Sequence, residues 1–255
     1  MEKLSIIIPS VREHLLYRCI SSMDGYPGYP VTIIAQKIKP IYTHHYFDEY
    51  LTIFGAFAKG IEMALPSEYY FLIDDDFIFR EGYRENILHA IHVLDTKPDI
   101  GCIIFSDNKN KKSQNNRIDV DLIPGMLHIL APKEIVHARK ESGLIIRREL
   151  LKEVFENTAH GEDFSKIIHC YLDGYDIGMI KANITHEHNP KDDLSWDKLS
   201  KELFGEYTKY DVNHFYYRVL KDMKLLDNDG LTEAGLKTHE YNKRRRQCKY
   251  LNTKD

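Results

Sequence analysis

The chain has 255 residues, a formal net charge of −4 at pH 7, 43% apolar residues and 29% charged residues. This length holds one sizeable α/β domain and an appendage, and the composition is that of a soluble globular protein. No apolar run approaches the roughly 20 residues that a membrane-spanning helix needs, and the N-terminus leads straight into a strand-like run without room for a signal peptide. The four cysteines are scattered and form no CxxC pair, which favours reduced thiols in the cytoplasm over a disulfide frame or a zinc site.

Short apolar runs alternate with segments of helical spacing over the first 105 residues. The strands that we predict here are residues 4–8, 31–35, 69–73 and 100–105. The predicted helices are residues 13–23, 50–64 and 84–94, and in the second of these the candidate inward side chains are Leu51, Phe54, Ala58, Ile61 and Met63. Strands that alternate with helices favour a mainly parallel, doubly wound sheet.

The second half of the chain has a less regular pattern. Residues 106–117 are polar and rich in lysine, which predicts an exposed loop. Further strands are predicted at residues 118–131, 143–147 and 177–184, and further helices at residues 148–155 and 164–172. After residue 190 the composition shifts to helical spacing with a basic tail. We therefore expect a main domain at residues 1–190 and a helical C-terminal segment at residues 191–255.

Three consecutive carboxylates, Asp74, Asp75 and Asp76, follow the predicted strand at residues 69–73. At the end of a buried strand their mutual repulsion is poorly screened, so a cation or a set of donors must neutralise it. A hard divalent ion such as Mg²⁺ or Mn²⁺ suits these oxygen ligands and keeps open positions for substrate phosphates. The cluster therefore indicates a metal-dependent enzyme acting on a phosphorylated donor, and a solvated acidic turn is the alternative interpretation.

Two landmarks in the first 80 residues resemble family 2 glycosyltransferases with the GT-A fold. Residues 5–10, Ser-Ile-Ile-Ile-Pro-Ser, resemble the opening strand of that family. Residues 54–61 resemble the helix that precedes its DxD strand, and the DxD motif itself is matched by Asp74 to Asp76.

Two further landmarks follow in the order that the family shows. Residues 160–163, His-Gly-Glu-Asp, resemble its ED motif, and residues 186–188, His-Glu-His, lie where the family often places a metal-binding histidine. The resemblance covers about residues 4–190. It implies an α/β fold of the GT-A type, which is Rossmann-like, with a mainly parallel central sheet flanked by helices.

The resemblance also implies a reaction and a cofactor. The reaction is the inverting transfer of a hexose from a nucleotide diphosphate sugar, in the first instance a UDP-sugar, to an acceptor hydroxyl. The ion, Mn²⁺ or Mg²⁺, would be held by Asp76 with the help of Asp74, and by His186 with His188 as the alternate. It would neutralise the charge that builds on the departing diphosphate.

Two carboxylates of the ED motif have implied catalytic roles. Asp163 would be the general base that removes the proton of the acceptor hydroxyl, and Glu162 would orient the acceptor or the donor. A base on the face opposite the leaving group gives inversion. Taken in isolation, Asp163 is typical of the N-cap of a helix that begins at Phe164.

The donor-binding residues that we expect lie mostly at the carboxyl ends of the first strands, where α/β sheets bind ligands. They are Pro9, Ser10, Arg12, Gln36, Lys59, Asp74 and Asp75. Many members of the family have an aspartate where Gln36 stands, so the sequence leaves the donor nucleobase open. The arginine that is common in the family's second helix is replaced, and Lys59 is the nearest cation.

The sequence leaves two classes of acceptor open. One is a surface glycan or its lipid-linked precursor, for which the basic tail from Lys243 to Lys249 would contact anionic headgroups. The other is DNA with a hydroxymethylated base, as in phage-type enzymes, for which the loop from Lys109 to Arg117 and the same tail would contact phosphates. In duplex DNA the target base would also have to be exposed or flipped.

Two other classes of protein stay open as alternatives. A nucleotidyltransferase uses a related sheet, but residues 9–12, Pro-Ser-Val-Arg, lack the glycines that normally follow its first strand. A non-catalytic module that binds a nucleotide sugar is disfavoured because Asp74, Asp76 and Asp163 are all present.

Overall fold

The computed structural model describes the greater part of residues 1–190 and short pieces of the remainder. The described residues are 1–23, 28–36, 45–48, 51, 53–106, 123, 125–130, 143–151, 170, 173–187, 226–227, 230–233 and 236. None of the described helices is long and apolar enough to cross a membrane.

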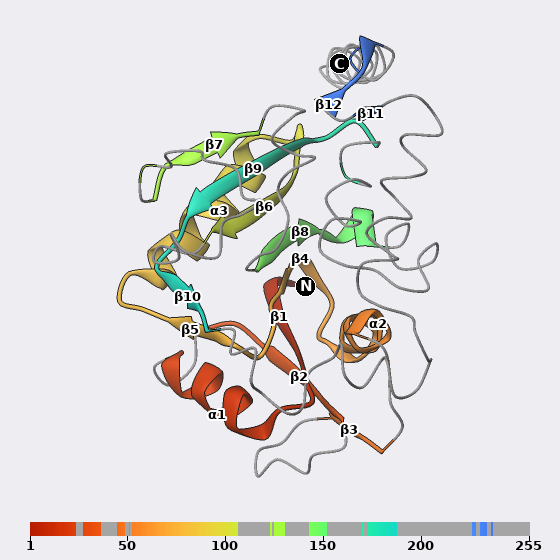
Figure 1. Cartoon of the computed structure of the whole chain (residues 1–255), viewed down its shortest axis with the longest axis vertical. Helices are drawn as coiled ribbons and strands as arrows, with labels where there is room; N and C mark the ends of the chain where they lie inside the picture. The colour runs from red at the N-terminus through yellow and green to blue at the C-terminus, as the bar shows by residue number, and fades with distance from the viewer. Residues whose placement is uncertain are drawn as a thin grey trace.

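The central sheet has eight strands within the described residues, in the order β3-β2-β1-β4-β8-β6-β9-β7 (Figure 1). Their bounds are β1 (Glu2–Ser10), β2 (Val31–Gln36), β3 (His45–Phe47), β4 (Ser67–Leu72), β6 (Ile100–Ser106), β7 (Leu127–Ile129), β8 (Leu144–Arg147) and β9 (Asp176–Lys181). β3, β2, β1 and β4 run parallel, whereas β8 is antiparallel to both of its neighbours, β4 and β6. β9 is parallel to β6, and β7 at the edge is antiparallel to β9. The sheet is mostly parallel, as predicted.

Within the described residues, two small sheets accompany the central one. β5 (Phe77–Phe79) follows the acidic cluster and pairs antiparallel with β10 (Ile184–His186), and β11 (Leu226–Asp227) pairs antiparallel with β12 (Gly230–Leu231). The sequence pattern predicts none of β3, β5, β11 and β12. The prediction of helices throughout residues 191–255 is wrong at residues 226–227 and 230–231, which pair as strands. Most of that segment lies outside the described residues, and the boundary at residue 190 stays a prediction.

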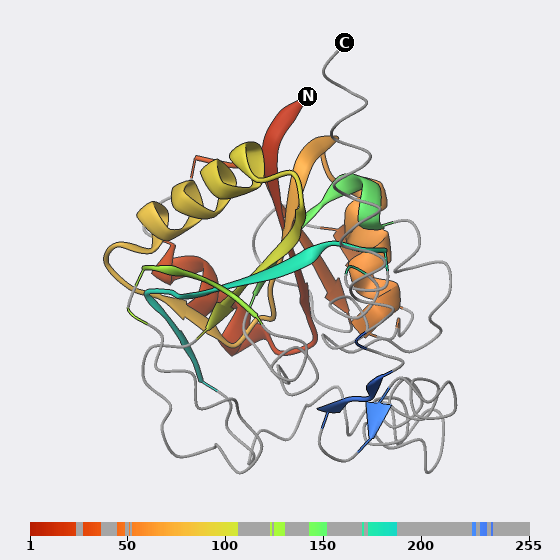
Figure 2. The same ribbon diagram turned by 90° about the horizontal axis from the view of Figure 1, so that it is seen from above.

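Helices cover both faces of the central sheet (Figures 1 and 2). The described helices include α1 (Glu13–Ser22), α2 (Ile53–Met63) and α3 (Tyr83–Thr96). Because successive side chains of a strand point to opposite faces, β1 turns Leu4, Ile6 and Ile8 into a core that it shares with α1 and α3. Ile7 points to the other face, where it meets α2. The strands are thus enclosed on both sides, which explains the apolar runs at residues 6–8, 69–72 and 102–105.

Helix α2 approaches the sheet through small residues. Ala56, Gly60 and Ala64 are buried, and a Cβ atom on Gly60 would lie 2.3 Å from Cγ2 of Ile7. The inward face predicted for this helix is displaced, since Ala56, Phe57 and Gly60 are buried, whereas Ala58 and Ile61 are half-buried and Met63 is 37% exposed. The close helix–sheet contact at Gly60 determines which side of the helix faces the sheet, and the spacing of apolar residues does not reveal it.

The predicted strand at residues 177–184 is in fact two strands, β9 and β10. The chain bends between them at Asn183, whose N–H donates to Oδ1 of Asn86 in α3 at 2.8 Å and whose carbonyl accepts from the N–H of Arg80 at 2.8 Å. The bend directs β10 away from the central sheet and onto β5 (Figure 1). It therefore brings the end of β10 to the acidic cluster.

Candidate functional site

The acidic cluster lies at the carboxyl edge of the central sheet. β1 ends at Ser10 and β2 at Gln36, and both run parallel to β4, which ends at Leu72 just before the cluster. The residues that follow these strand ends therefore meet at one edge, where sheets of this kind bind ligands. This agrees with the placement predicted from the sequence.

Asp75 is the innermost carboxylate of the cluster. It has no exposed surface, and both of its oxygens are bonded. The hydroxyl of Ser10 donates to Oδ2 at 2.6 Å, Nε of Arg12 donates to the same oxygen at 3.4 Å, and Nη2 of Arg12 donates to Oδ1. Burial raises the pKa of Asp75, and the guanidinium of Arg12 opposes that shift. The oxygens that Asp75 was predicted to offer to a donor are thus taken by Ser10 and Arg12.

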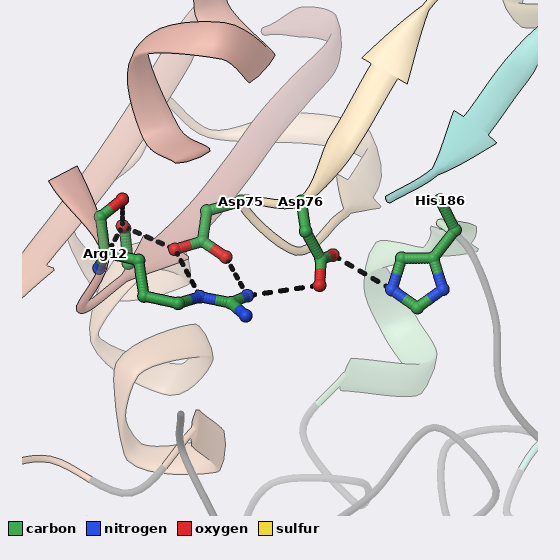
Figure 3. Close-up of polar contacts among 5 residues, drawn as sticks. Arg12, Asp75, Asp76 and His186 are labelled. Atoms are coloured by element: carbon green, nitrogen blue, oxygen red, sulfur yellow. Dashed lines mark hydrogen bonds and ion pairs between the residues drawn. The ribbon is translucent and has the colours of Figure 1, made fainter. Parts of the chain in front are cut away.

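Arg12 connects two carboxylates of the cluster. Its side chain is 5% exposed, and the Nη2 atom that contacts Asp75 also donates to Oδ2 of Asp76 at 3.2 Å (Figure 3). Burial disfavours the charged guanidinium, but Asp75, Asp76 and Asp74 together raise the pKa of Arg12 above its ordinary value. Arg12 is therefore a charged counter-ion inside the cluster. The described hydrogen bonds of its side chain go to the aspartates of the cluster. The sequence predicts instead that Arg12 contacts the donor.

Asp76 and His186 face each other at the small β5–β10 sheet. His186 lies opposite Phe77 in the ladder, and the two rings stack with their centroids 4.8 Å apart and an angle of 15° between their planes. Nε2 of His186 is 3.0 Å from Oδ1 of Asp76 (Figure 3). The N–H of Glu187 donates to the backbone carbonyl of Asp76 at 2.9 Å. Strand pairing, ring stacking and a backbone bond thus fix the relative positions of the two side chains.

The Asp76–His186 pair fits a divalent cation. A carboxylate oxygen of Asp76 and an imidazole nitrogen of His186 are the kinds of ligand that such an ion would take, and at 3.0 Å the same two atoms are within hydrogen-bond distance of each other. Asp74, two residues before Asp76 in the chain, is partly exposed. No group of three His, Cys, Asp or Glu side chains in the described part of the chain is arranged to hold a metal. A cation here would have two protein ligands and would take the others from phosphate oxygens or water, as Mg²⁺ commonly does.

Gln36 is a buried amide at the end of β2. It has no exposed surface, and its Oε1 accepts from the N–H of Leu51 at 2.6 Å, which fixes the orientation of the amide. Its Nε2 has no hydrogen-bond partner among the described residues. Since a buried donor without an acceptor costs about 1–3 kcal/mol, an acceptor atom supplied by a ligand would be stabilising at this position.

The other residues predicted to contact the donor lie in different surroundings. Pro9 is buried in β1, where it lies opposite Ile34 of β2. Lys59 lies about two turns into α2, and its Nζ forms an ion pair with Glu62 at 2.8 Å on the exposed side of that helix. Because α2 begins near the carboxyl edge and runs back toward the amino edge, Lys59 lies away from the acidic cluster.

Several predicted site residues lie outside the described residues. They are Glu162, Asp163 and His188, together with the basic loop at residues 109–117 and the basic tail at residues 243–249. The general base, the alternate metal ligand and the contacts to DNA or lipid therefore stay predictions.

The sequence pattern does not predict the ion pairs around Glu187. The carboxylate of Glu187 accepts from Arg18 in α1, and from Nη2 of Arg80 at 3.5 Å just after β5. Because Arg18 is 52% exposed and Arg80 45% exposed, these pairs contribute little stability. They do connect the end of β10 to α1 and β5. No short-range signal could have identified them, since the partners come from three separate parts of the chain.

The sequence matches no family model and no curated protein. Among solved structures, the chain is similar to residues 1–349 of TarS from S. aureus, with a TM-score of 0.55, 13% identity, and coverage of 99% of this chain and 73% of that one. The same TarS fragment in complex with UDP-GlcNAc gives a TM-score of 0.60 at 12% identity, over 91% of this chain and 69% of that one.

GalNAc-T7, crystallised with UDP, GalNAc and Mn²⁺, gives a TM-score of 0.51 at 12% identity, over 94% of this chain and 55% of that chain. These proteins are GT-A glycosyltransferases, and identities this low establish the fold alone. The fold class predicted from the sequence, an α/β fold of the GT-A type, is therefore confirmed.

Proposed function

We propose that this chain is a family 2-like, metal-dependent glycosyltransferase that moves a hexose from a nucleotide diphosphate sugar, in the first instance a UDP-sugar, to an acceptor hydroxyl with inversion. The observation that carries the proposal is the Asp76–His186 pair at the carboxyl edge of a GT-A sheet. The same fold binds UDP-GlcNAc in TarS and was crystallised with UDP and Mn²⁺ in GalNAc-T7. Both facts support a donor site at this edge.

Asp76 and His186 would hold Mn²⁺ or Mg²⁺, with Asp74 beside them. A bound ion of this kind neutralises the negative charge that develops on a departing diphosphate. Asp76 is 4% exposed, so the attraction between its carboxylate and a cation is screened less than it would be in water. Phe77, stacked on the ring of His186, keeps the imidazole from rotating away from Asp76.

Gln36 would donate its free N–H to an acceptor atom of the donor nucleobase. Its position at the end of β2 places it on the same edge as the acidic cluster. Uracil carries two carbonyl oxygens that can accept this bond. A uracil oxygen would therefore satisfy a buried donor that lacks an acceptor among the described residues.

Asp163 would accept the proton of the acceptor hydroxyl, and Glu162 would orient the sugar or the acceptor. For inversion the base must lie within hydrogen-bond reach of that hydroxyl, on the face of the hexose opposite the diphosphate. As the acceptor we propose a hydroxyl of a surface glycan or its lipid-linked precursor, modified in the cytoplasm. The basic tail at residues 243–249 supports contact with anionic headgroups.

A binding screen tests the proposal. The wild-type chain is titrated by calorimetry with UDP-glucose, UDP-GlcNAc, GDP-mannose and ADP-glucose, each with Mn²⁺, Mg²⁺ or EDTA. We expect a UDP-sugar to bind in the presence of Mn²⁺ and much more weakly in EDTA, and we expect slow release of UDP on long incubation. If no nucleotide sugar binds at millimolar concentration with either ion, the proposed function is wrong.

A further inference from the structure

We propose that Arg12 is a positioning residue: anchored by Asp75, it holds one oxygen of Asp76 so that the other oxygen is presented beside His186 to a cation. This inference rests on the proposed function. It replaces the role in donor binding that the sequence predicts for Arg12 and Asp75.

The anchor of this arrangement is the carboxylate of Asp75. It is fully buried, and it accepts bonds from Nε and Nη2 of Arg12 and from the hydroxyl of Ser10. A guanidinium bound through two nitrogens to a carboxylate is fixed in both direction and plane. The Ser10 hydroxyl also accepts from the backbone N–H of Arg12 at 3.1 Å. The backbone and the side chain of Arg12 are therefore both tied to the end of β1.

The contact with Asp76 follows from this anchoring. Nη2 of Arg12, which is already bonded to Oδ1 of Asp75, lies 3.2 Å from Oδ2 of Asp76. The other oxygen of Asp76, Oδ1, is the one that lies 3.0 Å from Nε2 of His186. The four side chains thus form a row from Asp75 through Arg12 and Asp76 to His186 (Figure 3). In this row Arg12 holds Oδ2 of Asp76, and Oδ1 is the oxygen that faces His186.

The position of Arg12 in the fold argues against a purely local role. Arg12 is the N-cap residue of α1, and its side chain makes no capping hydrogen bond there. N-caps favour Ser, Thr, Asp and Asn, and a positive charge is disfavoured at a helix N-terminus. The side chain of Arg12 therefore does not stabilise the start of the helix, and its contribution lies in the two aspartates that it joins.

The charge of the cluster supports the same assignment. Three carboxylates and one guanidinium leave a formal charge of −2 when His186 is neutral. That charge matches a divalent cation. Without Arg12 the cluster would carry an additional uncompensated charge on the fully buried Asp75. Arg12 therefore sets both the direction of Asp76 and the net charge that a cation meets.

The test compares variants by their affinity for Mn²⁺ in the presence of UDP. Arg12→Met alone leaves a buried carboxylate without its partner and should destabilise the fold strongly.

The double variant Arg12→Met/Asp75→Asn removes both charges and keeps the formal charge of the cluster at −2. The amide carbonyl that it introduces can still accept from the hydroxyl of Ser10. Arg12→Lys keeps the charge, but a single ammonium cannot form the two-nitrogen contact. The pair Lys3→Met/Asp95→Asn, which removes another ion pair far from the site, is the matched control.

We expect the double variant and Arg12→Lys to fold, to bind UDP in EDTA like the wild type, and to bind Mn²⁺ at least tenfold more weakly, with the control unchanged. Free Mn²⁺ measured by electron paramagnetic resonance gives this affinity directly. A folded double variant with Mn²⁺ affinity within twofold of the wild type would overturn the inference and leave the proposed function intact. If both variants fail to fold, the pair is a folding element only and the inference is also overturned. A wild-type chain that binds neither UDP nor Mn²⁺ overturns the proposed function as well.

Discussion

Nε2 of His186 lies 3.0 Å from Oδ1 of Asp76, although the two residues come from distant parts of the chain. The ladder between β5 and β10 brings them together, because Phe77 follows Asp76 directly and lies opposite His186. The bend at Asn183 makes this ladder possible, since it separates β10 from β9. The contact is therefore a consequence of the topology of the fold.

The first prediction concerns this contact. Replacing His186 by alanine removes one of two proposed protein ligands, so Mn²⁺ binding in the presence of UDP should weaken by roughly tenfold or more, with Asp76→Asn at least as severe. The free energy of unfolding should fall by no more than about 1–2 kcal/mol, mainly through the lost stacking on Phe77. Calorimetric titration and urea denaturation give the two quantities.

His92→Ala is the control for this prediction. His92 is an exposed histidine of α3, so its loss should change neither Mn²⁺ affinity nor stability measurably. Equal Mn²⁺ affinity in His186→Ala and His92→Ala would remove His186 from the site.

The sequence predicts the central sheet well and the site only in part. β1, β2, β4 and β6 each contain an apolar run that is followed by a polar residue, and such runs are recognisable because each strand is buried on both faces. β5 is three residues long and was not predicted, since so short a run has no period of its own. The inward face of α2 was predicted wrongly because close packing at Gly60 depends on the partner strand.

The different roles of the three aspartates could not be predicted from the sequence. Asp74, Asp75 and Asp76 are chemically identical, and their roles come from their neighbours in space. Asp75 points inward to Arg12 and Ser10, whereas Asp76 is shared between Arg12 and His186. Those neighbours belong to β1, to the start of α1 and to β10, and only the folded sheet brings them to one place.

The second prediction concerns Gln36. Gln36→Glu keeps the shape of the side chain, and one carboxylate oxygen can still accept from the N–H of Leu51. The other oxygen replaces the free N–H donor by a negative charge, which a nucleobase carbonyl would repel. We therefore expect the affinity for UDP to fall by roughly tenfold or more, in line with the loss of a buried hydrogen bond. The affinity for inorganic pyrophosphate, which has no base, should stay the same.

Calorimetry with UDP and with pyrophosphate separates these two outcomes. Lys59→Gln is the control, because Lys59 pairs with Glu62 on the exposed side of α2 and its loss should leave both affinities unchanged. A Gln36→Glu chain that binds UDP as the wild type does would mean that this amide does not contact the base.

The third prediction concerns alkaline stability. Burial and the hydrogen bond from the Tyr69 hydroxyl to Asp95 raise the pKa of Tyr69 to about 12. The protonated phenol is therefore favoured in the folded state. Its contribution to the free energy of unfolding is fully present below the unfolded pKa near 10, and it is lost as the pH rises through about 12. Between pH 9 and pH 11.5 the free energy of unfolding of the wild type should fall by about 1–2 kcal/mol more than that of Tyr69→Phe.

Urea denaturation of the wild type and of Tyr69→Phe at several pH values measures this difference. Lys3, which forms an ion pair with Asp95 at 2.6 Å, is present in both chains, so the difference between them measures the Tyr69 hydroxyl together with its interaction with Lys3. If the free energy of unfolding changes with pH in the same way in both chains up to pH 11.5, the folded state does not stabilise the protonated phenol.

The last prediction concerns the contact between α2 and the sheet. A Cβ atom at Gly60 would lie 2.3 Å from Cγ2 of Ile7 and 3.3 Å from Cγ1 of Ile34, so Gly60→Ala forces α2 away from β1. We expect a net loss of about 1–3 kcal/mol in the free energy of unfolding, even though alanine favours helix formation more than glycine does. In an Ile7→Ala background the obstructing methyl is absent, and the same Gly60→Ala change should there be neutral or stabilising. Urea denaturation of the wild type, the two single variants and the double variant gives the coupling free energy between positions 7 and 60. Additive effects of the two substitutions would contradict the direct contact.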